Sequence, residues 1–149
     1  MTDRSEPVVA EQTYKGVSLD KVWTAITDPI QMKQWFFEPM EDFEPKVDFE
    51  TEFNVQFEGA DYLHIWKILE VISQQKIVYD WRYGGVPGET TVTWELSESS
   101  DGTTLKLTHG GLDSFPDDPN FSREGTQAGW DYLVQQSLKA FLEGGSQGE

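Results

Sequence analysis

Apolar and polar residues alternate through the middle of the chain, from about residue 43 to residue 110. Successive side chains of a β-strand point to opposite faces, so a period of two predicts strands with one buried face. Between residues 76 and 83, for example, Ile77, Tyr79 and Trp81 share one face. The pattern predicts strands over residues 8–17, 49–57, 62–72, 76–83, 90–97 and 104–109.

Turn-forming residues separate the predicted strands. Gly84 to Gly88 is a glycine- and proline-rich break, Asp101-Gly102 is typical of a hairpin turn, and residues 58–61 provide another turn. Consecutive strands joined by short turns indicate an antiparallel meander, with one face packed and the other solvated.

Apolar residues recur every three to four positions in two regions, between the first and second predicted strands and after the last one. It predicts a short helix over residues 19–26, and Asp28-Pro29 then supplies an N-cap and a first helical residue for a second one over 29–35. A long helix is predicted over residues 122–143, ending at Gly144. Its inward stripe is Trp130, Leu133, Val134, Ser137, Leu138 and Phe141.

The order of elements predicts an α+β fold. A curved antiparallel sheet of about six or seven strands needs an element to fill its concave face, and the C-terminal helix is the only predicted one long enough. We expect its stripe to face Tyr79, Trp81, Trp94 and Leu107. Residues 8–143 form one predicted domain, with flexible ends at 1–7 and 144–149.

Composition narrows the function. The chain has 149 residues and no cysteine, which excludes disulfides and thiolate metal sites. Its 27 acidic and 11 basic residues give a formal charge of -16, which disfavours nucleic acid and anionic membranes as partners. No signal peptide or membrane span is evident, so we expect a cytoplasmic protein, and the oligomeric state stays open.

Two histidines are the first candidates for chemistry. Alternation places His64 and His109 on the concave face, where each could be a polar anchor or a general base. We favour core histidines with satisfied hydrogen bonds, because buried polar groups are usually paired. Two histidines without cysteine make a weak metal site. We therefore assign no catalytic residue, no metal and no cofactor.

Charged residues within the strands have two interpretations. Glu70 could be an acid with a raised pKa or an ion-pair partner of Arg82 or Lys67, and we favour the ion pair. Asp80 and Arg82 share the outer face, which predicts a solvated pair that contributes little to stability.

Several segments together carry a family resemblance. They are residues 22–29, 34–36, 68–71, 77–81, 91–96, 105–109 and 129–130. In this order and spacing they resemble the START-like (polyketide cyclase/lipid-transport) superfamily over about residues 8–143, and within it the group named for activators of heat-shock-protein-90 ATPase. The resemblance implies a helix-grip fold with some cavity. Trp66 stands where that family usually has a small residue, which implies that its ring fills part of the cavity.

The resulting functional hypothesis is that a small apolar or amphipathic molecule binds between sheet and helix. The candidate lining residues are Trp35, Phe36, Phe53, Phe57, His64, Trp66, Tyr79, Trp81, Tyr83, Trp94, His109, Trp130 and Val134. One alternative is a chaperone-associated or other protein-interaction domain, which the group's name implies. The other is a cyclase- or hydrolase-type enzyme that uses a cavity histidine or tyrosine, and we favour binding over catalysis.

Overall fold

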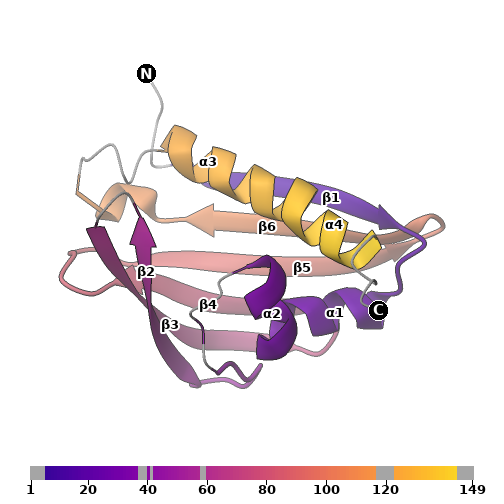
Figure 1. The fold of residues 1–149 in the computed structure, drawn as a ribbon, viewed down its shortest axis with the longest axis horizontal. Helices are drawn as coiled ribbons and strands as arrows, with labels where there is room; N and C mark the ends of the chain where they lie inside the picture. Colours follow the sequence, from indigo (N-terminus) through magenta and orange to yellow (C-terminus); the bar gives the residue numbers. More distant parts are fainter. Residues whose placement is uncertain (1–5, 37–39, 41, 58–59, 117–122, 144–149) are drawn as a thin grey trace.

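The computed structural model describes residues 6–36, 40, 42–57, 60–116 and 123–143. The predicted α+β order, with two short helices after the first strand and a long helix at the end, is confirmed (Figure 1). The elements are β1 (Val8–Lys15), α1 (Leu19–Thr27), α2 (Pro29–Trp35), β2 (Glu50–Phe57), β3 (Ala60–Ile72), β4 (Lys76–Tyr83), β5 (Thr90–Ser99), β6 (Gly102–Gly110), the 3-10 helix η1 (Leu112–Ser114), α3 (Arg123–Tyr132), the π-helical segment η3 (Leu133–Ser137) and α4 (Leu138–Glu143).

One antiparallel sheet holds the six strands in the order β1-β6-β5-β4-β3-β2. Strands β2 to β6 pair in sequence order, which confirms the predicted meander. β1 instead pairs with β6, with Val8 opposite His109 and Lys15 opposite Gly102. The first and last strands of the chain therefore lie side by side, next to the C-terminal helix (Figure 1).

Polar caps delimit the two short helices. The Ser18 hydroxyl accepts from the backbone N–H of Lys21 at 3.2 Å and begins α1. Asp28 serves both helices: its N–H donates to the carbonyl of Thr24 at the end of α1, and its carboxylate accepts from Ile30 at 2.9 Å at the start of α2. This single capping residue explains why the chain turns between two helices without a longer loop.

Gly102 at the β5–β6 hairpin is required by contact with β1. Its φ of +153° is one that side chains rarely adopt, and a Cβ there would collide with the carbonyl oxygen of Tyr14. Only glycine therefore lets the hairpin approach the end of β1 this closely.

The C-terminal helix spans 21 residues and contacts β1 along its length, while α1 and α2 contact its last segment α4. Its buried residues are Trp130, Val134, Leu138 and Leu142, each four positions apart. Leu133, Ser137 and Phe141 are only partly buried, and Leu142 was not part of the predicted stripe.

The π-helical segment explains this difference. Four residues of a regular α-helix turn about 400°, so a spacing of four drifts about 40° per step from one face. The wider turn of η3 holds more residues and offsets that drift. The same face of the helix thus meets the sheet from Trp130 to Leu142.

Side chains of the helix also cover the free edge of β1. Arg123 donates to the carbonyl of Pro7 at 2.9 Å, Gln127 to that of Val9 at 2.8 Å, and Gln135 to that of Glu11 at 3.2 Å. These are alternate backbone carbonyls, which an edge strand otherwise offers to another chain. The helix is thereby held along the strand by both apolar and polar contacts.

Candidate functional site

Phe36 follows α2 and lies among five buried tryptophans, which come from α2, β3, β4, β5 and α3. The distances from its ring centroid are 4.8 Å to Trp35, 5.6 Å to Trp66, 6.3 Å to Trp81, 5.7 Å to Trp94 and 5.8 Å to Trp130. Phe36 itself is only partly buried. The aromatic cluster between the sheet and the helices therefore reaches the protein surface at this residue.

Two hydrogen bonds hold the segment that carries Phe36. The indole of Trp35 donates to the carbonyl of Ala25 in α1 at 2.8 Å. The hydroxyl of Ser137, in the π-helical segment, donates to the carbonyl of Trp35 at 2.7 Å. The position of Phe36 is thus tied to both a short helix and the C-terminal helix.

Trp66 occupies the inner side of β3 and is fully buried. Its ring lies 4.8 Å from Phe53, 4.9 Å from Tyr79 and 4.8 Å from Trp81, measured between ring centroids. A small residue here would leave these three rings without a common neighbour. The indole therefore narrows the interior on the side of β3.

His109 connects the C-terminal helix to the sheet through a chain of buried hydrogen bonds. The indole of Trp130 donates to Nδ1 of His109 at 2.9 Å, and the hydroxyl of Thr90 lies 2.8 Å from Nε2. Because an indole N–H can only donate, Nδ1 accepts and the proton of the neutral ring sits on Nε2. The Thr90 hydroxyl in turn donates to the carbonyl of Trp81 at 2.7 Å. Burial lowers the pKa of His109 to about 3.

His64 lies at the other side of the same cluster and is buried. Its ring packs 5.1 Å from Phe53 and 4.8 Å from Tyr83, and its Nδ1 lies 3.0 Å from the carbonyl of Tyr62. A carbonyl only accepts, so Nδ1 carries the proton. Burial lowers the pKa of His64 to about 4, opposed by the bond to Tyr62. Both histidines are neutral at pH 7.

The tyrosines of β4 add polar groups to this interior. Tyr79 is fully buried, and its hydroxyl accepts a hydrogen bond from the indole of Trp94 at 2.9 Å. Burial raises the pKa of Tyr79 and also that of the partly buried Tyr83. The interior is therefore apolar and uncharged, with a few oriented hydrogen-bonding groups.

The remaining lining candidates divide into two cases. Val134 is fully buried, and its carbonyl, in the π-helical segment, accepts from the hydroxyl of Tyr14 at 2.6 Å. The side chain of Phe57 lies outside the described residues. The contact of Val134 with Tyr14 has no signal in the sequence, because strand and helix periodicity give the face of a residue but not its hydrogen-bond partner.

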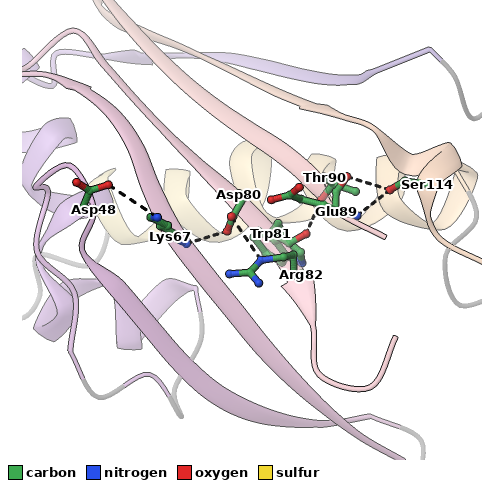
Figure 2. Close-up of polar contacts among 8 residues, drawn as sticks. All are labelled: Asp48, Lys67, Asp80, Trp81, Arg82, Glu89, Thr90 and Ser114. Carbon is green, nitrogen blue, oxygen red and sulfur yellow. Dashed lines mark hydrogen bonds and ion pairs between the residues drawn. The ribbon is translucent and has the colours of Figure 1, made fainter. Parts of the chain in front are cut away.

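A polar cluster, separate from the aromatic interior, lies on the face of the sheet turned away from the C-terminal helix (Figure 2). The Asp80 carboxylate accepts from the N–H of Lys67 at 2.8 Å and lies 3.4 Å from Nε of Arg82. Burial raises the pKa of Asp80. The hydrogen bond from Lys67 and the charge of Arg82 lower that pKa, and the Glu89 carboxyl raises it further. The expected pair with Arg82 is present, but the expectation that Asp80 is solvated is wrong, since it is only 4% exposed.

The prediction that Glu70 forms an ion pair with Arg82 or Lys67 is also wrong. A register shift between Ile68 and Glu70 places Glu70 opposite Val78, and its carboxylate pairs with Lys76 at 3.6 Å. Lys67 instead pairs with Asp48 at 3.9 Å. A bulge changes every pairing beyond it, and period-two alternation gives no warning of it.

Two kinds of feature are absent from the described part of the chain. Residues 6–36, 40, 42–57, 60–116 and 123–143 contain no group of three or more His, Cys, Asp or Glu side chains arranged to hold a metal ion. Within the same residues, no helix is long and apolar enough to cross a membrane.

Comparison with known proteins agrees with this architecture. The family model described as Activator of Hsp90 ATPase homolog 1-like protein matches residues 16–143. No curated protein sequence matches the chain.

Solved structures share the fold. Protein CV1439 from Chromobacterium violaceum is 21% identical with a TM-score of 0.76, over 93% of this chain and 97% of that one. Protein Mll3558 from Rhizobium loti is 24% identical with a TM-score of 0.78, over 91% and 95%. DynU16, a putative protein in the dynemicin biosynthetic locus, is 25% identical with a TM-score of 0.75, over 97% of this chain and 49% of that one.

Proposed function

The chain belongs to the family of Activator of Hsp90 ATPase homolog 1-like proteins, within the START-like superfamily, and from this premise we propose that it binds a small apolar or amphipathic molecule between its sheet and its C-terminal helix. The observation that carries the proposal is the position of Phe36. It contacts five buried tryptophans and still keeps part of its surface exposed. A ligand that displaces or stacks beside this ring would reach the aromatic cluster directly.

The chemistry of the interior defines the class of ligand. Small-molecule sites are mostly apolar, with a few polar groups that fix orientation. Here the lowered pKa values of His64 and His109 leave both rings neutral, and the Tyr79 phenol is neutral as well. An ionised group would lose its hydration without gaining an opposite charge. The site therefore suits an uncharged apolar or aromatic portion of a molecule.

The similarity to DynU16 offers a biosynthetic context for such a ligand. That protein is described as coming from a biosynthetic locus. A small product or intermediate of biosynthesis would fit the apolar and aromatic class that the interior favours.

Catalysis by a cavity histidine has less support than binding. A general base needs a nitrogen that can take a proton from the substrate. Both ring nitrogens of His109 already bond to Trp130 and Thr90. Proton uptake at Nδ1 would break the bond from Trp130.

Association with a chaperone is the alternative function, favoured by the description of the family. Titration of the protein into a heat-shock-protein-90 ATPase assay tests it. A concentration-dependent change in ATPase rate would support this alternative, and an unchanged rate would remove it.

Binding of N-phenyl-1-naphthylamine, an apolar and uncharged fluorescent probe, tests the proposed function. We expect saturable binding at one site per chain, with energy transfer from tryptophan to the probe. Phe36→Ala should change the affinity, while Ile30→Ala, which alters a 71% exposed residue of α2, should not. Absence of saturable binding, or equal effects of the two variants, would contradict the proposal.

A further inference from the structure

A hollow of about 630 Å³ lies where β1 ends, α1 begins and α4 ends. These three elements meet at one end of the domain (Figure 1). The buried side chains of Val17 and Leu142 contribute to its lining. None of the residues that line it belongs to the aromatic cluster around Phe36.

Three lysines line this hollow, namely Lys15, Lys21 and Lys139. The chain has only 11 basic residues against 27 acidic ones, so a group of three around one hollow contrasts with the rest of the molecule. Among the described residues, the only acidic one in the lining is Glu143, whose carboxylate lies 3.0 Å from Nζ of Lys139. The described lining residues thus carry a formal net charge of plus two, from three lysines and one glutamate.

Two of these lysines have no carboxylate partner in the described part of the chain. Lys15 and Lys21 form no ion pair within 4.0 Å there. Asp20 precedes Lys21 in the sequence, but its carboxylate accepts from the amide of Gln74 at 2.6 Å instead. An anion in the hollow would be attracted by ammonium groups that have no carboxylate partner among these residues.

We propose that this hollow binds a small anionic molecule through a phosphate or carboxylate group held by Lys15 and Lys21. Its volume falls within the range of about 300–1,000 Å³ that small-molecule sites occupy. Val17 and Leu142 offer an apolar surface for the uncharged part of such a molecule. The site is separate from the aromatic interior and would bind a ligand of different chemistry.

Amide chemical shifts of the full chain, followed by NMR during titration with inorganic phosphate and separately with acetate, test the proposal. Sodium chloride at matched ionic strength is the reference, because surface charges are screened by salt. We expect saturable shifts at Gly16, Val17 and Lys21 with at least one of the two anions, and the anion that binds more tightly identifies the head group.

Two double variants decide whether the lysines of the hollow are responsible. Lys15→Gln with Lys21→Gln should weaken binding about tenfold or more, which corresponds to about 1.4 kcal/mol. Lys33→Gln with Lys46→Gln removes the same charge from exposed positions elsewhere and should preserve it. Equal loss in both double variants, unchanged binding in the first, or the same shifts with chloride would mean an adventitious ion only and overturn the proposal.

Discussion

The indole of Trp130 donates a hydrogen bond to Nδ1 of His109 at 2.9 Å, and this bond joins the C-terminal helix to the last strand of the sheet. Both residues are buried, with 3% of their surfaces exposed. The bond fixes the tautomer of His109, and through Thr90 it extends to the backbone of β4. This chain of hydrogen bonds thus crosses the interior from the C-terminal helix to β4.

Substitution of Trp130 tests how much the helix depends on this contact. Trp130→Ala should lower the free energy of unfolding by about 3–5 kcal/mol, because a large buried ring is lost. Trp130→Phe should cost about 1–3 kcal/mol, because Nδ1 of His109 loses its donor. Urea denaturation measures both. Tyr132→Ala, at a 56% exposed position of the same helix, serves as control and should cost less than about 0.5 kcal/mol. A loss below about 1 kcal/mol in Trp130→Ala would refute this role.

The buried histidines predict a loss of stability in mild acid. The folded-state pKa of His109, about 3, lies below its ordinary value of 6.5. Between these two pKa values the unfolded chain binds a proton that the folded chain does not. The contribution of neutral His109 to the free energy of unfolding is therefore complete above pH 6.5 and decreases as the pH falls. The slope of the free energy of unfolding against pH approaches about 1.4 kcal/mol per pH unit for each such histidine.

The variant His109→Gln isolates this effect, since glutamine keeps an acceptor and a donor but does not titrate. The free energy of unfolding can be measured by denaturant at roughly half-unit intervals between about pH 4.5 and about pH 7.5. As the pH decreases, it should fall less steeply for the variant than for the natural chain. Parallel curves would show that His109 does not carry the pH dependence.

Much of the fold could be predicted from the sequence because local periodicity specified it. Asp28-Pro29 predicted the boundary between the short helices, and alternation predicted the inward faces of β4, β5 and β6. The buried stripe of the last helix was only partly predicted. Leu142 was missed because the π-helical segment changes the phase, and such a segment has no pattern of its own.

Burial and pairing of polar residues could not be predicted in the same way. Alternation places Asp80 on the outer face, but whether that face is covered depends on Lys67 and Arg82 from two strands. Lys15 and Lys21 lie near each other in sequence, on β1 and α1, but Lys139 comes from α4 at the other end of the chain, so no local spacing relates the three. The sequence indicated which aromatic residues face the interior, but not that Phe36 would contact five of the tryptophans.

The hydroxyl of Tyr14 should stabilise the π-helical segment. It donates to the carbonyl of Val134 at 2.6 Å, and both residues are fully buried. Tyr14→Phe leaves that carbonyl without this donor and should lower the free energy of unfolding by about 1–3 kcal/mol. Urea denaturation and amide hydrogen exchange of residues 133–138 measure the effect, and Tyr132→Phe is the exposed control. If both variants match the natural chain, the contact does not stabilise the segment.

The tryptophans themselves provide the most direct test of ligand binding in the interior. The chain has six, and all except Trp23 contact Phe36. In a sample labelled with 5-fluorotryptophan, the fluorine NMR signals can be assigned by single Trp→Phe variants and followed as N-phenyl-1-naphthylamine is added. Binding between the sheet and the helix predicts saturable shifts for several of the five tryptophans around Phe36 and an unchanged signal for Trp23. Shifts confined to Trp23, or no saturable shift at all, would contradict a binding site between the sheet and the helix.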